Sequence, residues 1–221
     1  MARYDGTADW YDTEFLGDLH DHGLGTGLRL LGPGPGRLID LGCGTGAHTA
    51  VFRDRGGWHV TGIDASEDML RRARDRGLDV LQADASVLPF EDASFDAAVS
   101  TWTHTDIDDF PAAVREVARV LKPDGPFVYV GGHPCFVGPH ALFRFGRGVP
   151  ELHPGYRPAR RYDDAEPGVF NPEGLRARVG ASHLPLGELV TAFTAAGLRV
   201  ERLEEDGEDD YPYLVALVAR R

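Results

Sequence analysis

The stretch from Leu38 to Gly46, Leu-Ile-Asp-Leu-Gly-Cys-Gly-Thr-Gly, constrains the fold of this chain more than any other. The apolar residues around Asp40 predict a short buried parallel strand, and the glycines after it predict a tight turn into a helix. Glycine is needed in such a turn because a side chain would stop the backbone from approaching a ligand closely. The stretch therefore predicts the first strand-to-helix turn of a doubly wound sheet, with a nucleotide-like cofactor bound there.

The identity of that cofactor depends on Asp40. The spacing Gly42-x-Gly44-x-x-Ala47 also fits a loose dinucleotide-binding pattern, so the glycines alone leave that alternative open. A carboxylate two residues before the first glycine would repel a pyrophosphate, whereas it would attract a cofactor that carries an ammonium and a sulfonium. The alternative interpretation is that Asp40 is a buried acid that only caps the next helix.

Strands and helices are predicted to alternate after residue 36. Apolar runs predict strands over 37–41, 58–63, 78–82, 95–101, 127–130, 198–203 and 213–219. Helices are predicted over 45–55, from Ser66 onward, over 108–121 and over 187–196, and the Ser66 hydroxyl suits the N-cap position. This alternation predicts an α/β fold with a doubly wound, mostly parallel seven-stranded sheet and helices on both faces.

An acid followed by Gly-x-Gly-x-Gly, as in residues 40–46, resembles motif I of the class I S-adenosylmethionine (SAM)-dependent methyltransferases. The resemblance implies that SAM is the cofactor, that S-adenosyl-L-homocysteine is the product, and that the last two strands form an antiparallel C-terminal hairpin. It covers residues 37–132 well, the hairpin moderately and the segment between them not at all. The cofactor-binding residues that it implies are Tyr11, Asp40, Gly42, Cys43, Gly44, Gly46, Asp64, Ala65, Met69, Asp84, Ala85 and Thr101.

Acids also lie at the ends of the next two predicted strands. Asp64 ends the second strand, where a carboxylate can accept hydrogen bonds from both hydroxyls of a ribose, and a helix-capping role is the alternative. The resemblance implies that Asp84, after the third strand, accepts from the adenine amino group while the next amide, of Ala85, donates to the ring. It also places the backbone near Thr101 against the ammonium of SAM. Residues 101–104 lack the Asn/Asp-Pro-Pro-aromatic pattern of the subgroup that methylates exocyclic or glutamine nitrogens, which argues against that activity.

Residues 1–36 are expected to form a helical N-terminal lid and a linker. Tyr4-Asp5 and Tyr11-Asp12 repeat a pair at an interval of seven residues, which is about two helical turns. This pattern resembles the lid segment of many small-molecule methyltransferases, in which such a tyrosine closes over the carboxylate of the cofactor. The alternative, compatible with the first, is an amphipathic helix that packs on the sheet through its aromatic face. The breaker at 32–36, Gly-Pro-Gly-Pro-Gly, separates the lid from the core.

Residues 37–132 together with 185–221 are expected to form the SAM-binding core, and residues 133–184 an insertion on the substrate side. These 52 residues are more than a simple connection to the next helix needs. Arginines outnumber acids in the insertion, which favours an anionic or carboxylate-bearing substrate, unless the arginines pair with acids of the core. The arginines are Arg144, Arg147, Arg157, Arg160, Arg161, Arg176 and Arg178, and the acids are Glu151, Asp163, Asp164, Glu166 and Glu173.

The methyl acceptor is expected to need a base where it carries a proton at neutral pH. Methyl transfer is an in-line displacement, so the protein must mainly align the nucleophile, the methyl group and the sulfur. Histidine suits the role of the base. His133 after the fifth strand and His104 after the fourth are the first candidates, with His140 in the insertion as a third. For each of them a structural role is the alternative interpretation.

The composition limits the partners. A formal net charge of −12 argues against a large nucleic-acid partner, whose phosphates the chain would repel. Two distant cysteines, Cys43 and Cys135, predict neither a disulfide framework nor a zinc site, and no metal is expected. The N-terminus is not signal-like and no apolar run has membrane-spanning length, so a cytoplasmic protein without a membrane partner is expected. The oligomeric state is left open.

These observations predict a SAM-dependent transfer of methyl to an O or N atom of a small-molecule acceptor, in biosynthesis or secondary metabolism. A tRNA or protein carboxyl methyltransferase is one alternative, and would need a charged open groove. A SAM-binding fold that catalyses non-methyl chemistry such as cyclisation is a second, and a non-catalytic SAM-binding subunit is a third. An NAD-dependent reductase is disfavoured by Asp40.

Overall fold

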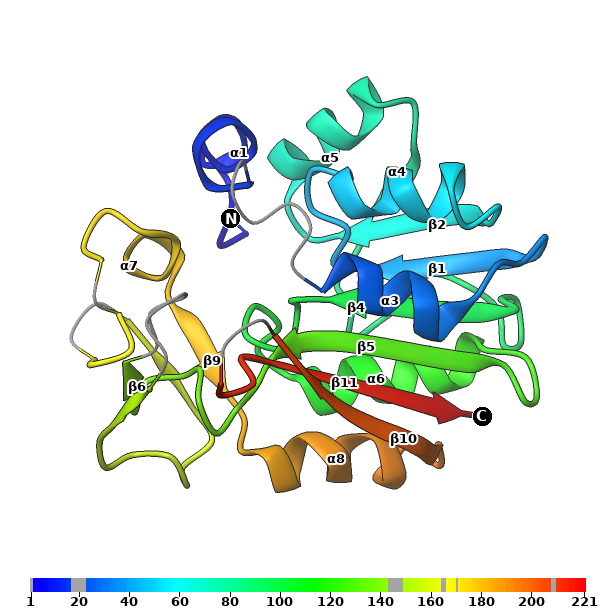
Figure 1. Ribbon diagram of the computed structural model, residues 1–221. Coiled ribbons are helices and arrows are strands. Elements are labelled where there is room, and N and C mark those ends of the chain that lie inside the picture. The colour runs from blue at the N-terminus through cyan, green and yellow to red at the C-terminus, as the bar shows by residue number, and fades with distance from the viewer. Residues whose placement is uncertain (1, 17–22, 143–148, 164–165, 170, 208–209) are drawn as a thin grey trace.

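The computed structural model describes residues 2–16, 23–142, 149–163, 166–169, 171–207 and 210–221, and a seven-stranded sheet runs through it (Figure 1). The strand order is β10-β11-β5-β4-β1-β2-β3. Strands β1 to β5 pair in parallel, whereas β11 pairs antiparallel with both β5 and β10. The predicted doubly wound sheet with an antiparallel C-terminal hairpin is therefore confirmed. The strands are β1 (Arg37–Leu41), β2 (His59–Asp64), β3 (Asp79–Gln82), β4 (Ala97–Thr101), β5 (Pro126–Gly132), β10 (Arg199–Asp206) and β11 (Leu214–Arg220).

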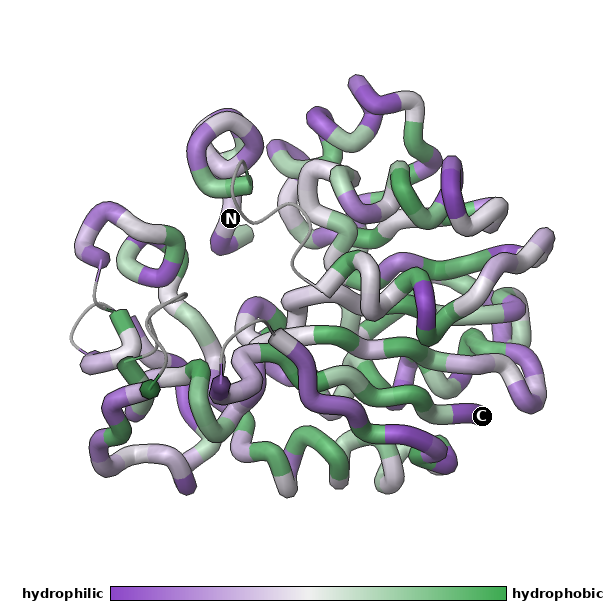
Figure 2. The backbone as a smooth tube through the Cα atoms, in the orientation of Figure 1, coloured by the Kyte–Doolittle hydropathy of each residue, from purple (hydrophilic) through white to green (hydrophobic). Residues whose placement is uncertain are grey.

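Helices cover both faces of the sheet because alternate residues of each central strand point to opposite sides. In β1, Leu38 packs against α3 and α4, whereas Ile39 belongs to the apolar cluster that α6 and α8 cover. Figure 2 shows the central strands as largely hydrophobic and the edge strand β10 as largely hydrophilic, an arrangement that protects a sheet edge from pairing with another chain. The helices are α3 (Leu24–Leu31), α4 (Ala47–Asp54), α5 (Glu67–Asp75), α6 (Phe110–Val120) and α8 (Leu186–Ala195).

Two side chains fix where helices begin. Ser66 is the N-cap of α5, as predicted, and its Oγ accepts a hydrogen bond from the Met69 amide at 3.4 Å. Asp109 caps α6 by accepting from the Ala112 amide at 2.9 Å, so this helix begins after the predicted residue 108. Both caps satisfy backbone N–H groups that have no partner within their helix.

The main departures in the core concern two strands next to each other. The fourth strand begins at Ala97 and not at the predicted residue 95, because Phe95 forms an isolated bridge with Leu121. The fifth strand continues past the predicted residue 130 to Gly132, because β11 pairs along its whole length up to Leu214 opposite Gly132.

The N-terminal segment is less helical than predicted. The spacing of Tyr4 and Tyr11 predicted one helix through both residues, but residues 3–7 form turns, with Gly6 at a φ of 81°, and the helix begins only at α1 (Ala8–Trp10). A π-helical stretch, η1 (Tyr11–Phe15), follows directly. The turn brings the two tyrosine rings together edge to face, with centroids 5.8 Å apart.

The insertion, residues 133–184, contains secondary structure of its own, as its length predicted. It holds two small antiparallel sheets, β6 with β7 and β8 with β9, which lie beside the carboxyl ends of the main strands (Figure 1). Three charged residues counted there, Arg144, Arg147 and Asp164, lie outside the described residues. The elements are β6 (Ala141–Leu142), β7 (Glu151–Leu152), β8 (Arg160–Tyr162), α7 (Leu175–Val179) and β9 (Ala181–His183). Across the part of the chain that the structure describes, no helix is long and apolar enough to cross a membrane.

Candidate active site

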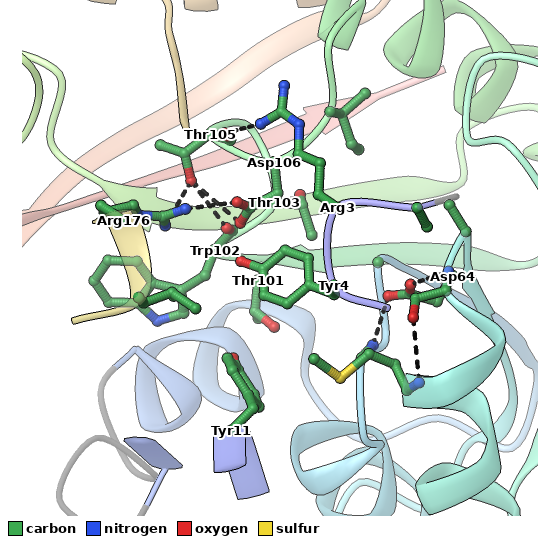
Figure 3. A pocket seen from close by; sticks show the side chains of 18 of the residues that line it. Arg3, Tyr4, Tyr11, Asp64, Thr101, Trp102, Thr103, Thr105, Asp106 and Arg176 are labelled. Atoms are coloured by element: carbon green, nitrogen blue, oxygen red, sulfur yellow. Dashed lines mark hydrogen bonds and ion pairs between the residues drawn. The ribbon is translucent and has the colours of Figure 1, made fainter. Parts of the chain in front are cut away.

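A cavity of about 720 Å³ lies at the carboxyl ends of the parallel strands. The turns after β1, β2, β3 and β4 line it, together with residues of the N-terminal segment and of the insertion (Figure 3). This is the place where open α/β sheets bind their ligands. The cavity volume falls within the range of about 300 to 1,000 Å³ that is usual for small-molecule sites.

The glycine turn after β1 serves two different purposes. Gly42, Gly44 and Gly46 all have positive φ angles, of 73°, 54° and 82°. A Cβ atom added to Gly44, which lines the cavity, would meet no atom within 4 Å, so this position leaves room for a ligand. A Cβ atom added to Gly46 would instead collide with the side chain of Leu78, so this glycine is required for packing.

Asp64 is held firmly at the edge of the cavity. Its Oδ2 accepts from the Gly44 amide and its Oδ1 from the Ser66 amide, each at 2.9 Å. Burial raises the pKa of the carboxyl group, and the backbone hydrogen bonds counteract that rise. A carboxylate has about four acceptor positions, so both oxygens can still accept hydrogen bonds from a ligand in the cavity.

Asp40 lies below the glycine turn and is not among the residues that line the cavity. It is 1% exposed, and its Oδ2 accepts from the Thr49 hydroxyl at 2.6 Å. Its Oδ1 has no hydrogen-bond partner among the described residues. Burial raises the pKa of this carboxyl group to about 7. Asp40 therefore contacts α4 through the side chain of Thr49. A direct attraction between Asp40 and the charges of a cofactor stays a prediction.

Most of the other predicted cofactor residues meet at the cavity. Gly46 does not line it, for the packing reason given above. Asp84 is exposed, and its Oδ1 accepts from the amide and the hydroxyl of Ser86 at 2.8 and 2.7 Å, so it shapes the local turn. Its contact with adenine stays a prediction. The predicted residues that line the cavity are Tyr11, Gly42, Cys43, Gly44, Asp64, Ala65, Met69, Asp84, Ala85 and Thr101.

None of the three candidate histidines is among the described residues that line the cavity. His104 is buried against Tyr129, whose hydroxyl is hydrogen-bonded to its Nδ1, and burial lowers its pKa to about 3. The Nε2 of His133 lies 2.8 Å from the Oε1 of Glu205 on β10. The Nε2 of His140 lies 3.0 Å from the Cys135 carbonyl oxygen. These contacts favour a structural role for each of the three histidines. The prediction that one of them acts as a base gains no support from them.

The structure also places residues at the cavity that the sequence analysis did not select. His48, in the first turn of α4, has its Nδ1 3.1 Å from the Oγ1 of Thr101 at the end of β4. The only sequence signal for it was its place two residues after Gly46. Asp106 and Arg176 form an ion pair of 2.6 Å at the cavity (Figure 3). No local pattern links these two residues, because they are 70 positions apart.

In the residues that the structure describes, no group of three or more His, Cys, Asp or Glu side chains could hold a metal ion.

Comparison with known proteins identifies the family. A model of a methyltransferase domain matches residues 39–129, which contain the glycine turn and the first strand ends. The demethylmenaquinone methyltransferase of Thermus thermophilus is 34% identical to this chain over 180 residues, which make up 75% of this chain and 82% of that protein. The chain belongs to the class I SAM-dependent methyltransferases. Membership of this family implies SAM as the cofactor.

Other methyltransferases are similar over a smaller part. The ubiquinone/menaquinone biosynthesis C-methyltransferase UbiE of Desulfotalea psychrophila is 37% identical over 128 residues, 54% of this chain and 52% of its own length. The malonyl-[acyl-carrier protein] O-methyltransferase of Erwinia pyrifoliae is 42% identical over 95 residues, 42% of this chain and 36% of its own length. The chain thus matches about half or less of these two relatives.

Solved structures share the complete fold. The crystal structure of a SAM-dependent methyltransferase from Mesorhizobium loti superposes with a TM-score of 0.71 at 26% identity, over 98% of this chain and 99% of that one. The [4+2]-cyclase SpnF superposes with a TM-score of 0.59 at 23% identity, over 92% of this chain and 80% of its own. The second comparison is one of fold alone.

The residues at the glycine turn fit the cofactor that the family implies. Gly44 faces open space, so its backbone can approach the cofactor without a clashing side chain. Asp64 offers a fixed carboxylate at the end of β2, where a ribose diol can donate to it. The buried Oδ1 of Asp40, without a described partner, lies next to this turn and is suited to a positive or water-bridged group.

Proposed function

We propose that this methyltransferase transfers the methyl group of SAM to a small-molecule acceptor that enters the cavity. The observation that carries this proposal is the position of the cavity, which extends from the glycine turn and Asp64 to the polar residues Asp106 and Arg176. When bound, SAM supplies an electrophilic methyl group on a sulfonium. One continuous enclosure thus gives room for the cofactor at one end and for an acceptor at the other.

The residues of the chain have the task of binding, aligning and excluding water. Asp64 and the Gly44 backbone would hold the cofactor at the floor. Tyr4, Tyr11 and Trp102 line the cavity and would exclude water from the reacting atoms. Since the reaction is an in-line displacement, positioning is the main contribution that a protein can make to it.

We infer a small acceptor over a macromolecular one because residues of the N-terminal segment and of the insertion line the cavity together with the strand ends. We propose that residues 1–36 and 133–184 act as lids over a core of residues 37–132 and 185–221. The N-terminal segment is joined to α5 by ion pairs of Asp12 with Arg76 at 2.8 Å and of Asp9 with Arg72 at 2.6 Å. Together with a net charge of −12, this closure disfavours tRNA or an extended polypeptide as the acceptor.

The acceptor atom is proposed to be O or N, with carbon as the second candidate. The name of the Erwinia relative states O-methylation, whereas the name of the Desulfotalea relative states C-methylation, and the Thermus relative is named for demethylmenaquinone. Methylation of a quinone precursor is therefore the second candidate function. Cyclisation without methyl transfer is a further alternative, since SpnF shares the fold.

The first experiment is a calorimetric titration with SAM, S-adenosyl-L-homocysteine and NADH. Wild-type protein is expected to bind the first two at micromolar concentrations, and Asp64→Ala is expected to lose more than about tenfold in affinity through the lost charge-assisted hydrogen bonds. The exposed Asp75→Ala variant on α5 is the matched control and is expected to bind as the wild type does. Binding of NADH alone would overturn the cofactor, and with it the proposed function.

The second experiment measures turnover. Release of S-adenosyl-L-homocysteine is followed with catechol, a naphthoquinol and bulk tRNA as acceptors, and NMR of the product locates the methyl group. Stoichiometric release with a small acceptor supports the proposal. Methylation of tRNA alone, or conversion of an acceptor without consumption of SAM, would contradict it.

A further inference from the structure

Three distant segments meet at one carboxylate in the cavity. Asp106 comes from the loop after β4, Arg176 from α7 of the insertion and Tyr4 from the N-terminal turn (Figure 3). The Nη1 of Arg176 lies 2.6 Å from the Oδ1 of Asp106. Tyr4 faces the same carboxylate, which acts on it by charge and by a hydrogen bond. The side chains of Asp106 and Arg176 are 19% and 23% exposed, and both line the cavity, so each presents part of its surface there.

The backbone of Asp106 is fixed before any ligand arrives. Its amide donates to the Thr103 carbonyl at 2.8 Å, in a tight turn that follows Trp102 at a φ of 62°. Arg176 is fixed as well, because its Nη2 donates to the Thr105 hydroxyl at 2.9 Å. Arg3 donates to the Thr105 carbonyl at 3.2 Å from the other side. Such supporting contacts hold a binding group in one geometry.

The charge of Asp106 is felt by the polar groups around it. Burial raises the pKa of Tyr4, Tyr11 and Tyr162, and the negative charge of Asp106 raises each of them further. Arg176 opposes that rise at all three tyrosines. The three phenols are therefore neutral at physiological pH, and the charges that act on all three are those of Asp106 and Arg176.

Two arginines of the insertion are paired with acids, whereas Arg161 also lines the cavity. Arg176 is paired with Asp106, and Arg160 is paired with Glu166 at 2.7 Å. For Arg160 and Arg176 the pairing agrees with the alternative that the arginines form salt bridges, and it opposes an acceptor whose carboxylate sits on Arg176. A carboxylate acceptor would meet the negative charge of Asp106, whereas a hydroxyl or amino group would meet a hydrogen-bond acceptor.

We propose that Asp106 is the acceptor-binding residue of this site and selects aromatic acceptors that carry an O–H or N–H donor. A carboxylate offers about four acceptor positions, and Arg176, Thr105 and Tyr4 occupy at most three of them. The aromatic rings of Tyr4, Tyr11 and Tyr162 around the cavity suit a flat ring. The inference rests on the proposed function, and it deepens it by naming the chemical class of the acceptor.

The test uses the full chain loaded with S-adenosyl-L-homocysteine and three matched probes: catechol, its dimethyl ether veratrole, and benzoate. Saturation-transfer NMR titrations give the affinity of each probe. Wild-type protein is expected to bind catechol at least about tenfold more tightly than veratrole or benzoate, because only catechol donates to Asp106. Asp106→Asn is expected to lower the affinity for catechol by about tenfold. It is expected to bind benzoate more tightly, because Arg176 then lacks its anionic partner.

Two further variants separate binding from folding. The double variant Asp106→Asn/Arg176→Gln replaces the ion pair with two uncharged side chains. It is expected to lose the preference for catechol and not to show the higher affinity for benzoate. Arg160→Gln breaks an ion pair of the insertion that does not line the cavity, and it is expected to leave all three probes unchanged. Affinity for S-adenosyl-L-homocysteine is expected to stay within about twofold in all variants, which is the size of a surface effect.

The outcomes distinguish this inference from the proposed function. Equal binding of catechol and veratrole to the wild type, or no binding of catechol while the cofactor product is bound, would overturn the role of Asp106. An Asp106→Asn variant whose affinity for benzoate does not rise would also overturn it, since the ion pair would then only tie the insertion to the core. Failure of the wild type to bind S-adenosyl-L-homocysteine would instead overturn the proposed function itself.

Discussion

The guanidinium carbon of Arg178 lies over the ring of Trp10, 4.3 Å from its centroid. This contact joins α7 of the insertion to the N-terminal segment directly. A second link runs from the Nη2 of Arg3 to the Ser182 hydroxyl at 3.0 Å. The N-terminal segment and the insertion therefore support each other, in addition to their separate contacts with the rest of the chain.

Removal of the contact between Arg178 and Trp10 is expected to loosen both the N-terminal segment and α7. A cation–π contact at a partly exposed site is worth about 0.5 to 1 kcal/mol. Trp10→Leu should therefore speed hydrogen exchange about two- to fivefold in residues 2–16 and also in α7, measured by mass spectrometry. Arg178→Gln should act in the same direction, whereas Arg199→Gln on the edge strand β10 should change neither segment. Faster exchange in the N-terminal segment alone would show that the two parts are independent.

Substitutions at the two glycines are expected to separate cofactor binding from stability. Gly44→Ala adds a methyl group that faces the cavity, so it should weaken SAM by about tenfold or more while costing only about 1 to 2 kcal/mol of backbone strain. Gly46→Ala adds a collision with Leu78 to the same strain, so it should lower the free energy of unfolding more. Calorimetry with SAM and urea unfolding of both variants check this. Equal losses of stability at the two positions would count against it.

Asp40 is expected to make the fold less stable as the pH rises. Its folded pKa of about 7 lies above the unfolded value of about 3.9, so the folded state binds more protons between those values and stability falls from about pH 4 to pH 7. Asp40→Asn removes this dependence and should gain stability relative to the wild type across that range, by at most about 4 kcal/mol. Urea unfolding at pH 5 and pH 8 measures the change, with Asp75→Asn as the exposed control. Parallel changes in Asp40→Asn and wild type would contradict the assignment.

His104 is expected to contribute the opposite slope. Its folded pKa of about 3 lies below the unfolded value of about 6.5, so the unfolded state binds more protons between those values and stability falls as the pH decreases from 6.5. The loss from this group at pH 5 is about 2 kcal/mol. His104→Gln can keep a hydrogen bond to Tyr129 and should lose less stability between pH 7 and pH 5 than the wild type. An unchanged acid sensitivity would show that His104 does not titrate in this way.

The floor of the site was predictable because its signals are local. Gly42, Gly44 and Asp64 lie where two consecutive strands end and lead into helices, and the alternation of the chain places such strand ends at one edge of a sheet. The strand pattern predicted the sheet for the same reason. A strand boundary moved where pairing with a distant strand decided it, as at Gly132, which pairs with Leu214 of β11.

The position of Asp106 and Arg176, where the acceptor is proposed to bind, was not predictable because it depends on how distant segments fold together. His133 was expected to face the cavity after β5, but the extension of that strand along β11 brings it to Glu205 instead. His104 follows Trp102, whose positive φ reverses the chain and turns the histidine back into the core. Asp106 and Arg176 carry no pattern of their own, since their pairing requires the fold of the insertion.

The contacts of Arg3 impose an order in which the molecule can be built. Its partners Thr105, Asp108 and Ser182 follow it by 102, 105 and 179 positions. During synthesis Arg3 can therefore complete its contacts only after Ser182 has emerged, whereas Asp9 and Asp12 can pair with Arg72 and Arg76 much earlier. The glycine turn and Asp64 lie in the first third of the chain. The contacts of Arg3 with Thr105, Asp108 and Ser182 thus become available only after the segment that carries the glycine turn has been synthesised.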